Sequence, residues 1–141
     1  MIRYLIIDDE PIAHDIIKGY CDLVPNMQLI KNCYDALEAF EFLNTNEVDL
    51  IFLDLNMPRK NGFECLLEIK KNQKFDDIAI AIYSTSSSEE DIENTFVSGA
   101  NIYIKKPSDF TMLKKILSEI VTLNWQYHTS GLNKENFLLR M

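Results

Sequence analysis

The chain has 141 residues, of which 47% are hydrophobic and 26% charged, and its formal net charge is −8. This length suits one domain with a real core, and the acidic balance argues against a broad nucleic-acid-binding surface and against docking on anionic lipid. No apolar run reaches the roughly 20 residues that span a bilayer, and the three cysteines form no Cys-x-x-Cys pair. We therefore expect a cytoplasmic protein with reduced thiols and with neither a membrane nor a nucleic-acid partner.

Five short apolar segments predict β-strands, at residues 2–7, 27–32, 49–53, 78–83 and 101–104. The first, third and fourth are almost continuously hydrophobic, which is typical of strands buried on both faces of a sheet. The second and fifth have a more mixed composition, which is typical of edge strands.

Helical segments are predicted between and after these strands, at residues 11–24, 35–43, 62–70, 88–97 and 109–125. Pro11 suits a first helical position, and Asp35 and Ser88 suit N-caps. The apolar positions of the first helix recur at helical spacing, at Ile12, Ile16, Tyr20 and Leu23. Alternating strands and helices indicate an α/β fold with a doubly wound parallel sheet. By analogy with flavodoxin we expect a single (βα)5 domain of strand order 2-1-3-4-5, whose ligand site lies at the carboxyl ends of the strands.

Polar side chains gather at these predicted strand ends. Asp8, Asp9 and Glu10 follow the first strand, and Asp54 follows the third. The fourth strand ends at Ser84 and Thr85, and the fifth at Lys105 and Lys106. Crowded carboxylates repel one another, so a cation should join them, and oxygen ligands of this kind suit Mg²⁺. A carboxylate beside a metal ion, a lysine and a hydroxyl suits in-line attack on a phosphoryl group.

Four motifs in this order, DDE, FLDLNMPRKNG, YSTS and IYIKKP, resemble the receiver domain of two-component response regulators. The resemblance covers residues 1–122. The early part looks most like receivers of LytTR-type regulators, and the later part looks like small stand-alone, CheY-like receivers.

The resemblance implies a role for each matching residue. Asp54 matches the phosphoacceptor, and Asp9 and Asp8 match metal ligands, the latter largely through water. Asn56 would offer its backbone carbonyl to Mg²⁺, and Glu10 matches a frequent third acid. The remaining matches are the switch hydroxyl Ser84, the phosphoryl-binding Lys106, the aromatic switch Tyr103 and Pro107 after a cis peptide bond. Ser86 and Asn56 lie where they could tune attack by water.

The implied function is acceptance of a phosphoryl group from a sensor histidine kinase or a histidine phosphotransfer protein. Tyr103 would turn inward after phosphorylation, and the fourth helix, fifth strand and fifth helix would present an altered face to a downstream protein or to a second copy of the chain. Two alternatives stay open. One is a receiver-like module that binds without phosphorylation, and the other is a small Mg²⁺-dependent aspartyl-phosphate phosphatase.

Several neighbouring residues favour plainer interpretations. His14 is expected to be a partly exposed helix residue, Lys105 a solvated neighbour of Lys106, and Thr85 a poorer match than Ser84. Residues 123–141 form a tail that is too short for a DNA-binding output domain. A short helix from Asn133 could carry Phe137, Leu138 and Leu139, which could fold back on the domain, pack on a second subunit or contact a partner.

Overall fold

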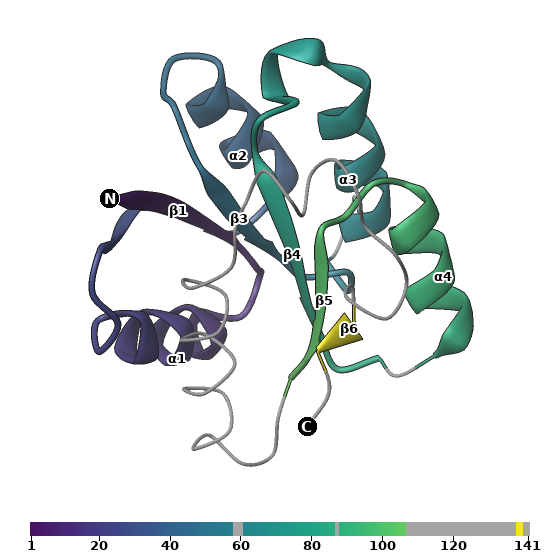
Figure 1. Cartoon of the computed structure of the whole chain (residues 1–141), viewed down its shortest axis with the longest axis horizontal. Helices are drawn as coiled ribbons and strands as arrows, with labels where there is room; N and C mark the ends of the chain where they lie inside the picture. The colour runs from purple at the N-terminus through teal and green to yellow at the C-terminus, as the bar shows by residue number, and fades with distance from the viewer. Residues whose placement is uncertain (58–60, 87, 107–137, 140–141) are drawn as a thin grey trace.

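A computed structural model describes residues 1–57, 61–86, 88–106 and 138–139. These residues form a parallel sheet whose strands lie in the order β2-β1-β3-β4-β5-β6. The strands are β1 (Ile2–Ile7), β2 (Met27–Cys33), β3 (Leu50–Leu53), β4 (Ala79–Ser84), β5 (Ile102–Lys105) and β6 (Leu138–Leu139). The predicted order 2-1-3-4-5 is confirmed, and the sheet continues by one strand (Figure 1).

The described helices are α1 (Pro11–Cys21), α2 (Ala36–Leu43), α3 (Gly62–Lys71) and α4 (Glu89–Val97), with a 3₁₀ turn at Gln73–Phe75. Both predicted caps are confirmed, because Asp35 accepts a hydrogen bond from the Glu38 amide and Ser88 accepts one from the Asp91 amide. Pro107 and the predicted helix at 109–125 lie outside the described residues. Within the described part of the chain, no helix has the length and apolar character needed to cross a bilayer.

Both faces of the sheet are buried, because alternate side chains of each central strand enter different hydrophobic clusters. Leu5 and Ile7 of β1 pack with residues of α2, α3 and α4. Tyr4 and Ile6 pack on the other face with residues of α1. Figure 1 shows α1 on the opposite side of the sheet from α2, α3 and α4. This two-sided burial explains why the central strands are unbroken apolar runs in the sequence.

The buried stripe of α1 differs from the predicted one. Ile12 and Leu23 are 69% and 60% exposed, whereas Ala13, His14, Ile17 and Cys21 are buried. Of the predicted stripe, Ile16 and Tyr20 are partly buried and pack at the border of the core, so the buried face is rotated from the predicted one. The expectation that His14 is partly exposed is therefore wrong, because its exposed fraction is 2%.

The end of the chain also departs from expectation, because Leu138 and Leu139 form a strand and not part of a helix. They pair in parallel with Tyr103 and Ile104 of β5. This part of the tail folds back on the domain, the first of the three alternatives, and β5 is not an edge strand. The unpaired backbone groups of an edge give a physical reason, since they accept any extended segment within reach.

Gly62 allows α3 to begin directly against the segment that follows β3. Its amide donates to the Leu55 carbonyl over 2.9 Å. A Cβ atom at position 62 would lie 1.9 Å from the Asp54 carbonyl oxygen, closer than any real contact. The obstructing atom belongs to the backbone, so a side chain here would displace either α3 or Asp54.

We predict that Gly62→Ala lowers the free energy of unfolding by about 3 kcal/mol, because the added methyl group overpacks a rigid contact. Gly19→Ala in α1 is the matched control, since a Cβ atom added at that position would meet no other atom within 4 Å. It should be neutral or stabilising by roughly 0.5–1 kcal/mol. Urea denaturation measures both, and equal effects of the two substitutions would contradict the packing argument.

Candidate functional site

Four charged side chains from three strand ends meet at the carboxyl edge of the sheet. Asp8 and Asp9 follow β1, Asp54 follows β3, and Lys106 follows β5. Ligand oxygens of the three acids all lie within 4.8 Å of one another. The Lys106 Nζ atom lies 3.0 Å from Asp8 Oδ2 and 3.8 Å from Asp54 Oδ1. The chain thus brings together the acids and the lysine that the sequence places at strand ends.

Asp54 is a buried member of this group whose ionisation is disfavoured. It is only 3% exposed, and its pKa is raised to about 6. Burial is the largest cause, and the negative charges of Asp8 and Asp9 add to it, whereas Lys106 and a backbone hydrogen bond from Asn56 act in the opposite direction. One ammonium group therefore only partly offsets the repulsion among three carboxylates.

The acid group fits a hard divalent cation. The Asp9 Oδ1 atom is buried and has no hydrogen-bond partner among the described residues. A buried carboxylate oxygen without a donor is costly, and a metal ion would satisfy it. All three side chains offer oxygen atoms, which Mg²⁺ and Mn²⁺ prefer over nitrogen or sulfur ligands.

Lys106 is held in place by backbone and ring contacts. Its amide donates to the Ser84 carbonyl over 2.7 Å, and its Nζ atom lies 5.3 Å from the centroid of the Tyr83 ring. The side chain is 14% exposed, while Lys105 is exposed. Lys106 is thus the lysine that the structure brings to the acids, and Lys105 is the solvated neighbour that we predicted.

Ser84 and Tyr103 are linked through Ser86. The Ser84 Oγ atom accepts a hydrogen bond from the Ser86 amide over 3.1 Å, and the Tyr103 hydroxyl donates to the Ser86 carbonyl over 2.9 Å. The Ser86 hydroxyl itself donates to Asp91 of α4 over 2.6 Å. These contacts connect the end of β4, the middle of β5 and the first turn of α4.

Tyr103 points inward, which is the position that we expect it to take after phosphorylation. Its exposed fraction is 0%, and burial raises the pKa of its hydroxyl, so the group remains a hydrogen-bond donor. Leu138 of β6 pairs beside it along the backbone. The hydrogen bond from the Tyr103 hydroxyl to the Ser86 carbonyl holds the ring in this position.

Two further predicted site residues contribute through their backbone. Glu10 is exposed and does not belong to the three-acid group, but its amide donates to Asp8 Oδ1 over 2.9 Å. Asn56 is also exposed, and its amide donates to the Asp54 carboxylate. Pro107 lies outside the described residues.

Sequence reasoning missed His14 as a contact of the site. Its Nε2 atom lies 2.7 Å from the Asp8 carbonyl oxygen, and its Nδ1 atom lies 2.7 Å from the side-chain amide of Asn32. A polar residue in the stripe formed with Ile17 and Cys21 was the available signal, because a buried histidine requires partners.

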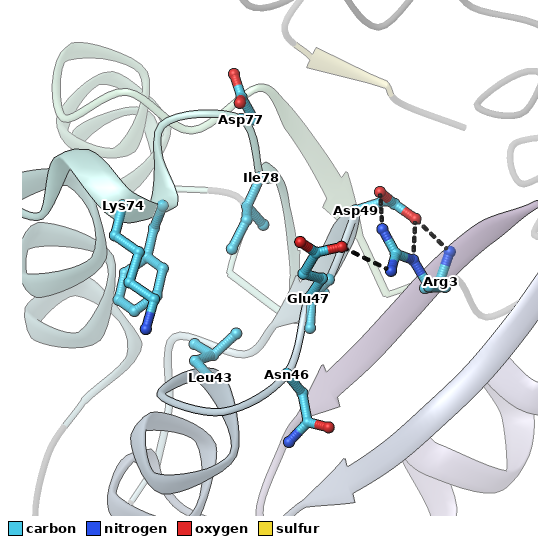
Figure 2. A pocket seen from close by; sticks show the side chains of 10 residues that line it. Arg3, Leu43, Asn46, Glu47, Asp49, Lys74, Asp77 and Ile78 are labelled. Carbon is cyan, nitrogen blue, oxygen red and sulfur yellow. Dashed lines mark hydrogen bonds and ion pairs between the residues drawn. The ribbon is translucent and has the colours of Figure 1, made fainter.

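A hollow of about 340 Å³ lies at the opposite edge of the sheet from the acids, where the strands begin. Figure 2 shows Arg3 between Asp49 and Glu47, with ion-pair distances of 3.0 and 3.2 Å. Its guanidinium group lowers the pKa of Asp49 through a side-chain hydrogen bond. Two of the acids that line this hollow, Glu47 and Asp49, are thus neutralised by Arg3.

A family model described as the response regulator receiver domain matches residues 4–118. The transcriptional regulatory protein MalR of Bacillus subtilis is 32% identical over 119 residues, which cover 84% of this chain and 50% of MalR. A chemotaxis protein CheY homolog of Campylobacter jejuni is 26% identical over 121 residues, which cover 85% of this chain and 92% of that protein. The chain thus spans about half the length of MalR and nearly all of the CheY homolog.

Solved structures agree with this relationship. The Mn²⁺-bound response regulator Rcp1 superposes with a TM-score of 0.76 at 26% identity, covering 94% of this chain and 98% of Rcp1. The phosphorylated cyanobacterial phytochrome response regulator RcpA gives 0.76 at 27% identity, covering 93% and 96%. With its five predicted strands in the expected order and its acids and lysine at their carboxyl ends, the chain belongs to the response regulator receiver domain family.

Proposed function

We propose that the chain accepts a phosphoryl group from a phosphohistidine onto Asp54, with Mg²⁺ as cofactor, and passes the change to a protein partner. The observation that carries this proposal is the Asp54 carboxylate, buried among Asp8, Asp9 and Lys106. Such a carboxylate is kept dry and is surrounded by groups that suit the charge of a phosphoryl group.

In the proposed reaction an Asp54 carboxylate oxygen attacks phosphorus as the bond from phosphorus to the donor's imidazole nitrogen breaks. Asp8, Asp9, Asp54 and the backbone carbonyl of Asn56 would hold the divalent cation, which when bound offsets the charge of the acids and of the phosphoryl oxygens. Lys106 supplies an ammonium group for those oxygens, because it already lies 3.8 Å from Asp54 Oδ1.

The readout would run through the Ser84–Ser86 segment to α4. If the Ser84 hydroxyl turns to bond the phosphoryl group, it leaves the Ser86 amide, and Ser86 also holds Tyr103 and Asp91. A local charge change would thus bias the position of the first turn of α4. The altered face would comprise α4, the segment that follows β5, and the edge of the sheet where β6 covers β5. It would contact a target protein or a second copy.

The relatives support both halves of this proposal. Rcp1 binds Mn²⁺ and RcpA is phosphorylated in structures that this chain resembles along most of its length. We propose that a sensor histidine kinase or a histidine phosphotransfer protein is the phosphoryl donor, in the cytoplasm. In this proposal residues 1–122 form the receiver and residues 123–141 a tail, Ser86 and Glu10 have secondary roles, and the chain catalyses no reaction beyond its own phosphorylation and dephosphorylation.

The alternatives receive less support. A module that only binds would not need the metal-ready Asp9 oxygen or the paired Lys106. An aspartyl-phosphate phosphatase usually carries its nucleophile after the first strand in a DxD pattern, whereas the buried candidate here follows β3.

Intact mass spectrometry after incubation with acetyl phosphate tests the proposal. The wild-type chain should gain one phosphoryl group when Mg²⁺ is present and none when the metal is chelated. Asp54→Asn should gain none under either condition, because the nucleophile is absent. No adduct on the wild type, or an undiminished adduct on the variant, would contradict the proposal.

Lys106→Met should slow phosphorylation of Asp54 by roughly 100-fold, because removal of one preorganised charge from a phosphoryl site has an effect of that order. Lys105→Met is the matched control, since it removes the same charge from the adjacent exposed position and should leave the rate within about twofold. The measurement is the time course of adduct formation, and similar rates for the two variants would argue against a role for Lys106.

A further inference from the structure

The turn between β1 and α1 carries two neighbouring acids of the site, Asp8 and Asp9, which are held in different ways. Asp8 is held at three points: its amide donates to the Cys33 carbonyl, and its carboxylate accepts hydrogen bonds from the Glu10 amide and from Lys106. Asp9 has fewer constraints, since its Oδ1 atom has no hydrogen-bond partner among the described residues. The orientation of Asp9 therefore depends on the backbone that carries it.

The Asp8 carbonyl belongs to the peptide plane that joins Asp8 to Asp9. Because this plane is rigid, the direction of the carbonyl fixes the direction in which the backbone enters Asp9. A carbonyl oxygen can only accept a hydrogen bond, so the contact of 2.7 Å with His14 Nε2 is a bond donated by the imidazole ring. His14 thus fixes the one peptide plane that lies between two of the acids.

The imidazole ring is itself fixed on its other sides. A neutral ring that donates through Nε2 can only accept at Nδ1, so the Asn32 side-chain amide on β2, 2.7 Å away, supports the ring by donating an N–H to Nδ1. The Tyr34 ring packs against it, with centroids 4.4 Å apart and planes 33° apart. A buried ring with two hydrogen-bonded nitrogens and a stacked neighbour has one available position, so it can act as a rigid support.

We propose that His14 is a positioning residue for the divalent cation site, acting through the Asp8–Asp9 peptide and supported by Asn32. This inference rests on the proposed function, because it concerns the affinity of the same acids for Mg²⁺. Residues that orient metal ligands without touching the metal typically change its affinity by 10–100-fold when they are replaced.

The test compares His14→Leu with His14→Gln in the full chain. His14→Leu removes the donor while keeping the position apolar, and it should raise the Kd for Mg²⁺ about 10-fold. His14→Gln keeps an N–H donor on a side chain of similar reach, and its Kd should stay within about threefold of the wild-type value. Backbone amide chemical shifts followed during a magnesium titration give each Kd.

The kinetic readout separates positioning from a general loss of structure. For His14→Leu, the Mg²⁺ concentration that gives half-maximal phosphorylation by acetyl phosphate should rise about 10-fold. The rate at saturating Mg²⁺ should change by less than about threefold, because His14 touches neither the nucleophile nor the phosphoryl group. A fall in the saturating rate with an unchanged metal requirement would overturn the inference.

Ile17→Ala is the matched control. Ile17 lies almost one turn further along α1 on the same buried face, and it is 1% exposed. Its truncation should lower the urea midpoint and leave the Kd for Mg²⁺ unchanged. If Ile17→Ala raises the Kd as much as His14→Leu does, the effect comes from destabilisation and the inference is wrong.

Asn32→Ala gives an independent test that does not alter the buried helix face. Asn32 is only partly buried, so the variant should fold, and loss of its contact should raise the Kd less than His14→Leu does. If the Kd for Mg²⁺ is unchanged in both Asn32→Ala and His14→Leu, the inference about His14 is wrong, while the proposed function still stands. If the wild-type chain binds no Mg²⁺, the proposed function fails as well.

Discussion

The cost of burying three carboxylates beside one another is the constraint on which the rest of this structure depends. Asp8 and Asp54 are nearly inaccessible to water, and the charge of Lys106 offsets only part of their repulsion. A rise in the pKa of Asp54 from 3.8 to about 6 corresponds to a folding penalty of about 3 kcal/mol when the group ionises. The sign follows from linkage: the penalty is absent below pH 3.8, grows as the pH rises through about 6, and is fully present at neutral pH.

The elements around the site keep these charges together despite that penalty. The parallel sheet brings the ends of β1, β3 and β5 to one edge, and Gly62 lets α3 close against the Asp54 backbone. The buried cores on both faces of the sheet supply the stabilisation. Such a charged site is suited to switching, because binding of a cation or a phosphoryl group changes its electrostatic free energy by several kcal/mol.

Sequence reasoning succeeded where a charged residue directly follows an apolar strand segment. The parallel strand order and the convergence of Asp8, Asp9, Asp54 and Lys106 follow from apolar runs that end in charged residues. Sequence reasoning failed where two different structures are compatible with the same sequence pattern. Spacing alone could not decide which stripe of α1 is buried, so it misplaced His14. Leu138 and Leu139 fit a helix as well as a strand, and only the open edge of β5 decides between them. The close contact of Gly62 with the Asp54 backbone depends on how α3 packs in three dimensions, which the spacing of residues in the sequence does not reveal.

The most direct test of the central claim is the free energy of unfolding of the wild-type chain and of Asp54→Asn at pH 7.5, with and without Mg²⁺. Without metal, the variant should be more stable than the wild type by on the order of 2–3 kcal/mol, because the charge that burial and the neighbouring acids penalise is gone. Mg²⁺ should stabilise the wild type strongly and the variant much less. A variant that is less stable than the wild type without metal, together with no stabilisation of the wild type by Mg²⁺, would contradict the account.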